Sequence, residues 1–318
     1  MTAEAAILVA HGTVDDLREL PEFTTRIRRG HPPPPELIAE LTRRYEAIGG
    51  QSPLNAINRR LAARVENALG KPTRVANRLA RPFVKDVLAE LAKTGIRKVA
   101  AVPLAQYSAH VYAEAAAAAA SELARDDVRV EVASASSWGS DAELLDAYAD
   151  AITSSLDALP EAARTSLVLS AHSLPLSVIQ AGDPYEAEFR AAAKGVTERV
   201  LARAKGKDVH PVVAFQSQGM SRGPGGKPVE WLGPDLIATI DACQDRGDTH
   251  VLFAPIGFLA DHVEILYDLD IEACAWVEAR GMRYHRTPSL NDSERLARIL
   301  ARLAGPLLEG PHPVDASS

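Results

Sequence analysis

Short apolar runs alternate with helical patterns along almost the whole chain, and this alternation constrains the fold more than any other feature. AAILVA (residues 5–10), RKVAAVPL (97–104) and TSLVLSAH (165–172) are rich in aliphatic residues, and a segment with helical spacing of apolar residues follows each. Buried strands separated by helices are typical of a parallel sheet covered by helices on both faces. The sequence therefore predicts an α/β protein.

The second half of the chain resembles the first. A strand ending in AHG (10–12) is matched by one ending in AHS (171–173), and PLAQYSAHV from Pro103 is matched by PIGFLADHV from Pro255. We expect two similar lobes, residues 1–158 and 159–318, although a chance likeness of two α/β halves is the alternative. Ligands bind at the carboxyl ends of parallel strands, so we expect the strand-end histidines at a cleft between the lobes.

Composition excludes several classes of protein. The chain has 318 residues, 47% hydrophobic and 24% charged, with a net charge of -7, and no basic block predicts nucleic acid as a partner. Two cysteines are too few for a disulfide framework and indicate a reducing compartment. No signal peptide and no transmembrane-length apolar run is evident, so we expect the cytoplasm. GxGxxG and P-loop motifs are absent as well.

One acidic segment, PIGFLADHVEILYDLDIE (255–272), is the first candidate for chemistry. We expect Asp261 to cap a helix on which Glu264, Asp268 and Glu272, spaced four apart, share one face. Acids so close repel one another, so the stripe makes physical sense if a cation visits it. A solvated helix face is the alternative.

Strand-end histidines are the second candidate. His172 with Glu264 would combine a neutral imidazole and a carboxylate, which suit a divalent first-row metal and proton abstraction near neutral pH. His11 and His110 would add a pair from the first lobe. The alternatives are a hydrogen-bonded structural role for His172 and a helix-capping role for His110.

Long motifs resemble the ferrochelatase family over nearly the whole chain. They are SAHSLP (170–175), AGDPY (181–185), AFQSQG (214–219), WLGP (231–234) and the acidic segment, extended by IRRG (27–30) and RRYEAIGGQSPL (43–54). The resemblance implies two Rossmann-like lobes with a tetrapyrrole in the cleft between them. It also implies a lyase of heme biosynthesis that inserts Fe²⁺ into a porphyrin, protoporphyrin IX or coproporphyrin III, with release of two protons.

The resemblance assigns residues as well. It makes His172 and Glu264 catalytic, with Asp268 and Glu272 leading iron to them, and we expect the imidazole and the carboxyl to face each other across a gap as wide as a flat macrocycle. His11 and His110 are further metal candidates. The expected substrate-binding residues are His11, Arg28, Arg44, Tyr45, Ser52, Gln106, Tyr107, Ser108 and Trp231 with the glycine-rich loop before it.

Departures from the family keep alternatives open. Coproporphyrin-using relatives carry tyrosine where this chain has His11, whereas Gln106-Tyr107-Ser108 resembles the protoporphyrin-using members. VAHGT and PLAQYSAHVYAE are similar to sirohydrochlorin chelatases, which leaves a cobalt or iron chelatase for that substrate as an alternative. A non-catalytic tetrapyrrole or metal carrier and a periplasmic-type binding protein are others; the acidic line argues against the first and the missing signal peptide against the second.

Cofactors and partners follow from the same resemblance. Fe²⁺ is expected as a substrate, with no tightly bound cofactor and no iron-sulfur cluster, because two cysteines cannot supply four ligands. A hydrophobic product favours weak peripheral membrane contact, although no basic amphipathic helix supports it. The oligomeric state is left open.

Overall fold

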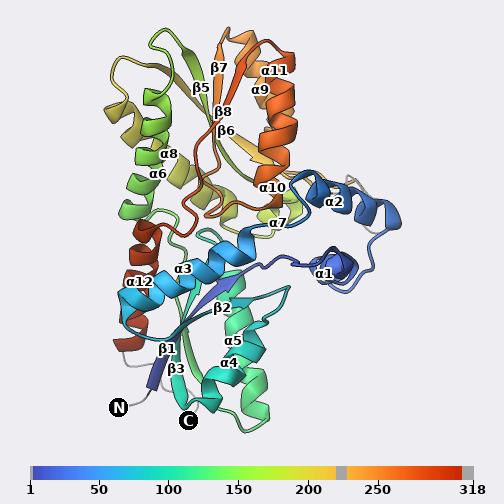
Figure 1. Cartoon of the computed structure of the whole chain (residues 1–318), viewed down its shortest axis with the longest axis vertical. Coiled ribbons are helices and arrows are strands. Elements are labelled where there is room, and N and C mark those ends of the chain that lie inside the picture. The colour runs from blue at the N-terminus through green and yellow to red at the C-terminus, as the bar shows by residue number, and fades with distance from the viewer. Residues whose placement is uncertain (1–2, 220–227, 310–318) are drawn as a thin grey trace. The chain divides into compact units, whose positions relative to one another are not determined.

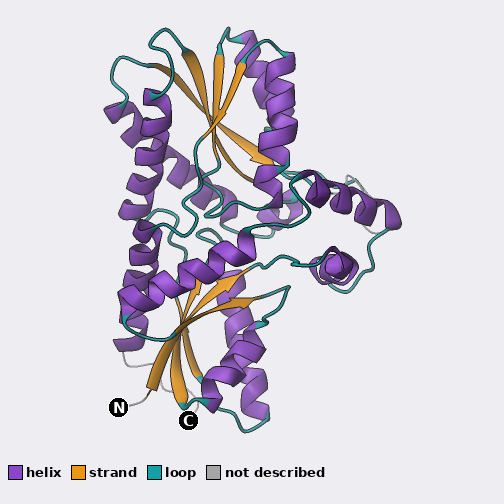
Figure 2. Ribbon diagram, viewed as in Figure 1, coloured by secondary structure: helices purple, strands orange, loops and turns teal. Residues whose placement is uncertain are grey.

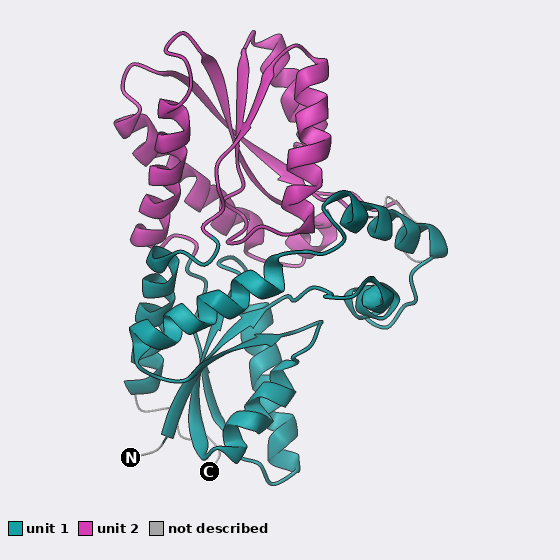
Figure 3. Cartoon of the chain, viewed as in Figure 1, with its two compact units in different colours: residues 1–138, 291–318 teal, residues 139–290 magenta. Residues whose placement is uncertain are grey.

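The computed structural model describes residues 3–219 and 228–309, and the chain divides into two compact units (Figure 1, Figure 3). Unit 1 comprises residues 1–138 and 291–318, and unit 2 comprises residues 139–290. Helices lie on both faces of a parallel sheet in each unit (Figure 2). The α/β class with two Rossmann-like lobes, predicted from the sequence, is confirmed.

Unit 1 is built on a sheet in the order β2-β1-β3-β4, in which every pair is parallel. β1 lies between β2 and β3, and its residues Ala5 to Val9 are fully buried, as expected for a strand covered on both faces. The elements are β1 (Ala3–Ala10), η1 (Leu17–Glu19), α1 (Leu20–Ile27), α2 (Pro35–Ala47), α3 (Leu54–Leu69), β2 (Thr73–Asn77), α4 (Val84–Lys93), β3 (Ile96–Pro103), α5 (His110–Arg125), β4 (Glu131–Ser134) and α12 (Glu294–Glu309).

Unit 2 repeats the same order as β6-β5-β7-β8, again with every pair parallel. β5 takes the place that β1 has in unit 1, which agrees with the sequence likeness of the two halves. The elements are α6 (Ala142–Asp157), β5 (Arg164–His172), α7 (Leu176–Gln180), α8 (Tyr185–Arg203), β6 (Asp208–Gln216), α9 (Leu236–Asp245), β7 (His250–Ala254), α10 (Val263–Leu266), η3 (Asp268–Ala273), α11 (Cys274–Ala279) and β8 (Arg283–Arg286).

The two units differ from the expected lobes, residues 1–158 and 159–318, in the helices that they contain. α6 packs on α8 and belongs to unit 2, whereas the C-terminal helix α12 packs on α3 and β3 and belongs to unit 1. Both are amphipathic helices that bury an apolar face, and that face alone does not specify the sheet on which it packs.

Apolar residues from the sheets and helices form the cores. In unit 1, Leu88 and Leu91 of α4 and Leu123 of α5 pack with β1 and β3, and in unit 2 Ile240 and Val277 pack with β7. Burial of each such side chain contributes roughly 1.5–3 kcal/mol. Among the described residues, no helix combines the length and the apolar character needed to cross a bilayer.

α3 begins at Leu54, with Pro53 as the preceding cap residue. Ser52 contributes to this start, because its Oγ lies 3.4 Å from the Leu54 nitrogen and accepts its hydrogen bond. This contact orients Ser52 at the start of the helix.

Candidate active site

The carboxyl ends of β5, β6 and β7 lie at one edge of the unit 2 sheet, and the candidate site is built there. β5 ends at His172, which is in register with Gln216 at the end of β6. After β7 the chain passes close to β5, since the Gly257 nitrogen donates to the Ser170 oxygen at 2.9 Å. A Cβ on Gly257 would lie 2.4 Å from the Ala171 Cβ, so only glycine permits this approach. The loop thereby brings the acidic segment to His172.

That acidic segment is not the regular helix that the spacing predicted. α10 is followed by the π-helical segment η3 and then by α11, and the Glu272 nitrogen donates to the Tyr267 oxygen five residues back. The wider π turn breaks the four-residue repeat, so the stripe of Glu264, Asp268 and Glu272 is not formed as expected. Asp268 is buried and Glu272 is half-buried.

The expected cap at Asp261 is wrong. The residue before α10 is His262, in extended conformation and without a side-chain cap, while the Asp261 carboxylate accepts bonds from Arg286 and Ser289. A nearby arginine outcompetes the weaker backbone amides for this carboxylate.

The Glu264 carboxylate lies between two imidazoles. Its Oε1 is 3.5 Å from His172 Nε2, and its Oε2 is 3.5 Å from His262 Nε2. His172 Nδ1 contacts the Ser173 carbonyl, which turns Nε2 toward the carboxylate. The structure therefore brings His172 and Glu264 together, but the expected gap between them for a flat macrocycle is wrong. The sequence alone assigned no role to His262, and its position two residues before Glu264 is the signal that could have found it.

Charge pairing sets the protonation of this group. Burial alone would lower the pKa of His172, but the Glu264 carboxylate, helped by the Ser173 carbonyl and Asp268, raises that pKa to about 9. Burial acts to raise the pKa of Glu264, yet His172 and His262 hold it well below its usual range. At neutral pH the pair is an imidazolium and a carboxylate, whereas the sequence predicted a neutral imidazole.

Side chains at the end of β6 hold the acidic segment in place. The Gln216 amide donates to the Glu264 backbone oxygen at 2.9 Å and accepts from Ser170 Oγ at 2.8 Å. Ser217 Oγ donates to Asp268 Oδ2. Gln216 and Ser217 belong to the AFQSQG motif, so that motif positions Glu264 and Asp268.

The predicted metal ligands are gathered only in part. His172, Glu264 and His262 meet, and Asp268 acts on His172 electrostatically. Within residues 3–219 and 228–309, no three His, Cys, Asp or Glu side chains converge as a ready-made metal cage. Glu272 makes no contact with this group in the described interactions, so its role as a ligand stays a prediction.

The predicted residues of the first lobe all lie in unit 1. Tyr45 Oη and Thr13 Oγ1 share a hydrogen bond of 2.7 Å, and the His11 ring meets Phe23 edge-on at 6.1 Å. Arg28 donates to the His31 carbonyl and Arg44 donates to Glu40. Tyr45, Ser52, Gln106, Tyr107 and Ser108 are buried, and His110 begins α5 as an exposed residue. Their contact with substrate stays a prediction.

Trp231 packs beside the chain that follows His172. It forms a bridge with Pro175, and a Cβ on Gly219 would lie 2.7 Å from the indole. Ser173 Oγ donates to the Leu232 oxygen at 2.9 Å, which ties the two segments together. Residues 220–227 of the glycine-rich loop, also predicted to contact substrate, lie outside the described residues.

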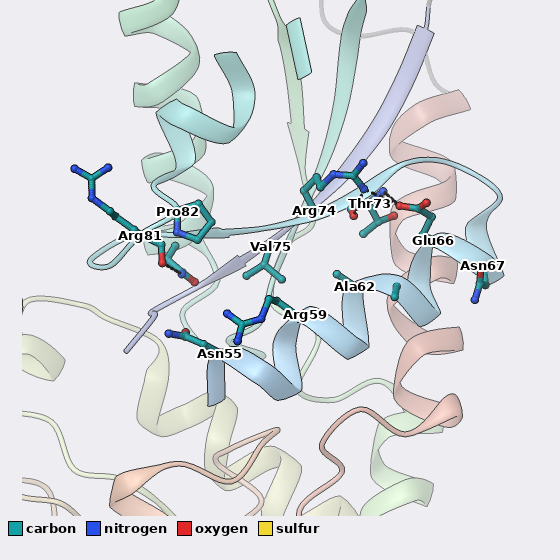
Figure 4. Close-up of a pocket in the computed structure, with 12 residues that line it drawn as sticks. Asn55, Arg59, Ala62, Glu66, Asn67, Thr73, Arg74, Val75, Arg81 and Pro82 are labelled. Carbon is teal, nitrogen blue, oxygen red and sulfur yellow. Dashed lines mark hydrogen bonds and ion pairs between the residues drawn. The ribbon is translucent and has the colours of Figure 1, made fainter. Parts of the chain in front are cut away.

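A separate cleft of about 490 Å³ lies between α3 and β2 in unit 1 (Figure 4). Asn55, Ala62 and Val75 are among the residues that line it, and it contains none of the predicted site residues. The arginines on its rim are already paired, in Arg59–Asp15, Arg74–Glu66 and Arg81–Asp86. The cleft therefore does not bear on the candidate site.

The two units share one parallel strand order, and a His–Glu–His group lies at the carboxyl edge of the unit 2 sheet, so the chain is a two-lobed α/β protein with a candidate site for a metal and a proton. Two solved structures share this fold: SirB from Bacillus subtilis with Fe³⁺ (TM-score 0.58, 13% identity, 96% of each chain) and CbiX, the terminal enzyme for siroheme biosynthesis in denitrifying bacteria (TM-score 0.51, 15% identity, 94% of this chain and 97% of the other). The family described as Ferrochelatase matches residues 3–306, and the chain belongs to it.

Similar sequences with known names support the same family. A ferrochelatase of Acidobacterium capsulatum is 35% identical over 322 residues, covering 94% of this chain and 93% of the relative. Coproporphyrin III ferrochelatases of Geobacillus kaustophilus (33%, 93% of each chain) and Bacillus subtilis (30%, 93% of this chain and 94% of the relative) are similar over the same extent. Family membership confirms the predicted enzyme, a chelatase that inserts iron into a porphyrin in heme biosynthesis.

Proposed function

We propose that this enzyme inserts Fe²⁺ into coproporphyrin III, and that the insertion takes place at the edge of the unit 2 sheet where Glu264 lies between His172 and His262. The placement of that carboxylate, 3.5 Å from each imidazole, is the observation that carries the proposal. Relatives named coproporphyrin III ferrochelatases, 30–33% identical over nearly the whole chain, support this substrate.

The reaction replaces two protons on the macrocycle with one divalent cation, so the charge is conserved. Two pyrrole protons leave the macrocycle as Fe²⁺ enters, so the site needs anionic groups that attract a divalent cation and a base that accepts protons. Glu264 and the buried Asp268 supply the anionic oxygens, and imidazole nitrogen suits iron as well as protons. We assign Glu264 as the transient iron ligand and His172 as the proton acceptor, with Asp268 and Glu272 on the path that leads iron to them.

His172 must lose a proton before it can accept one. Its imidazolium form is held by Glu264, which raises the pKa of His172 to about 9. When Fe²⁺ binds the Glu264 carboxylate, the cation replaces the imidazolium as the partner of that carboxylate, and like-charge repulsion lowers the pKa of His172. Iron arrival thus releases the imidazolium proton to solvent and leaves His172 as the base that takes one pyrrole proton, and the second pyrrole proton passes to solvent.

The substrate side rests on unit 1. Arg28 and Arg44 carry guanidinium groups suited to propionate carboxylates. Tyr45 and Ser52 belong to the same motif as Arg44, RRYEAIGGQSPL. Protoporphyrin IX is a second candidate, because the buried Gln106-Tyr107-Ser108 element resembles that of the protoporphyrin-using members. His11, where coproporphyrin-using relatives carry tyrosine, is the residue on which the two candidates differ.

Neither a resident cofactor nor an iron-sulfur cluster belongs to this proposal. Cys243 is buried and Cys274 is half-buried, both are free, and two thiols fall short of the four that a cluster requires. Free thiols fit a reducing compartment, and we propose the cytoplasm as the place of action.

An anaerobic assay tests the proposal. The protein is mixed with Fe²⁺ and, in parallel, with coproporphyrin III, protoporphyrin IX and sirohydrochlorin, and metallation is followed by the Soret and visible bands. The expected result is rapid metallation of coproporphyrin III. Preferential metallation of protoporphyrin IX would shift the substrate to the second candidate, and metallation of sirohydrochlorin alone, or of nothing, would reject the proposal.

A further inference from the structure

One arginine binds two carboxylates of the acidic segment, one before and one after Glu264 in the sequence. Arg286, the last residue of β8, binds Asp270 with two bonds, Nε to Oδ1 at 2.7 Å and Nη2 to Oδ2 at 3.0 Å. Its Nη1 also donates to Asp261 Oδ1 at 3.1 Å. Asp261 precedes α10 and Asp270 lies in the π-helical segment η3, so one guanidinium spans the stretch that carries Glu264.

The ion pairs of Arg286 are partly shielded from solvent, and neighbouring hydroxyl groups donate further hydrogen bonds to the same carboxylates. The Arg286 side chain is 15% exposed, against 21% for Asp261 and 32% for Asp270. Tyr284 Oη donates to Asp270 Oδ1 at 2.8 Å, and Ser289 Oγ donates to Asp261 Oδ1 at 2.7 Å. Ion pairs at this depth are screened less than surface pairs, so they hold their geometry better.

The acidic segment departs from a regular helix in two ways, the missing cap at Asp261 and the π turn, and both occur where Arg286 binds. Asp261 is drawn away from capping α10, which leaves His262 extended beside Glu264, and Asp270 is fixed inside the π turn. Five fixed N–H donors allow arginine to serve two carboxylates at once, whereas the single ammonium of lysine cannot reproduce that fork.

We propose that Arg286 is a positioning residue for iron: by joining Asp261 to Asp270 it holds Glu264 and Asp268 in the arrangement through which the metal reaches His172. The inference rests on the proposed function for its meaning in catalysis. Arg286 itself acts only through these carboxylates.

Arg286→Lys tests the role, with Arg280→Lys as the matched control. Arg280 is 22% exposed, pairs with Asp241 at 2.6 Å and donates to the Trp276 oxygen, so these contacts involve neither Asp261 nor Asp270. Groups that orient metal ligands typically account for 10–100-fold in metal affinity. We therefore expect Arg286→Lys to raise KM for Fe²⁺ about 10–100-fold with KM for porphyrin unchanged, whereas Arg280→Lys lowers only Tm.

A second readout needs no turnover. Calorimetric titration of the porphyrin-free protein with Co²⁺ is expected to show the same loss of affinity in Arg286→Lys and none in Arg280→Lys. Should Arg286→Lys fail to fold, Asp261→Asn releases one arm and is expected to weaken Co²⁺ binding in the same direction. Unchanged KM and unchanged Co²⁺ affinity, or equal losses for iron and porphyrin, would overturn the inference. Loss of Co²⁺ affinity in a protein whose wild type metallates no porphyrin would instead reject the proposed function alone.

Discussion

Replacing Glu264 with glutamine should change the protonation of His172 more than any other single substitution. The side chain keeps its shape but loses the charge that lies 3.5 Å from His172 Nε2. Burial lowers the pKa of His172, and in this variant the carboxylate charge that opposes burial would be gone. We expect the pKa of His172 to fall from about 9 by about one unit or more.

The magnitude follows from the size of the perturbation. A rise in pKa from 6.5 to about 9 corresponds to about 3.4 kcal/mol at about 1.36 kcal/mol per pKa unit. The His172 side chain is 33% exposed, so solvent screening reduces this figure. We take about 1–2 kcal/mol as the working value, which still moves the pKa by about one unit or more.

Stability should follow the same sign. The folded pKa of His172 lies above the unfolded value, so its contribution is present in full below pH 6.5 and is lost as pH rises through about 9. The wild type should therefore exceed Glu264→Gln in free energy of unfolding most clearly near pH 6, and the difference should shrink toward pH 9.

The assay is a titration of the imidazole nitrogens by long-range ¹H–¹⁵N NMR in metal-free protein, with His172→Gln identifying the resonance. A wild-type midpoint near 9 and a Glu264→Gln midpoint lower by about one unit or more are expected. Equal midpoints in the two proteins would refute the electrostatic reasoning, because the charge on Glu264 would then have no effect on the pKa of His172.

Two further predictions concern packing and substrate. Gly257→Ala would force a Cβ to within 2.4 Å of the Ala171 Cβ, so the free energy of unfolding should fall by about 1–3 kcal/mol in urea denaturation; an unchanged midpoint would contradict the close approach. Arg44→Leu removes a guanidinium proposed to bind a propionate, so coproporphyrin III affinity should fall about tenfold in a fluorescence titration while KM for Fe²⁺ stays constant, and unchanged porphyrin affinity would exclude the contact.

Much of the fold follows from local patterns. Continuous aliphatic runs such as residues 5–10 predicted strands buried on both faces, and the matched segments after Pro103 and Pro255 predicted two sheets of like order. The assignment of α12 to unit 1 was missed, because an amphipathic helix carries no local mark of the sheet on which it packs.

The site was predictable in its members but less so in its geometry. Strand-end position and motif brought out His172 and Glu264, which the structure places in contact. The π turn was not predicted, since it coincides with bonds from Arg286 and Tyr284, residues distant in sequence from Asp270. His262 was missed as a partner of Glu264, because its place beside that carboxylate depends on the extended backbone before α10.

The most direct test of the account mixes Fe²⁺ anaerobically with porphyrin already bound to wild type or to His172→Ala, and follows the Soret band over a single turnover. The account predicts that both proteins bind porphyrin with similar Kd and that His172→Ala metallates it at least about 100-fold more slowly. Metallation by His172→Ala at the wild-type rate would contradict the assignment of His172 as the base.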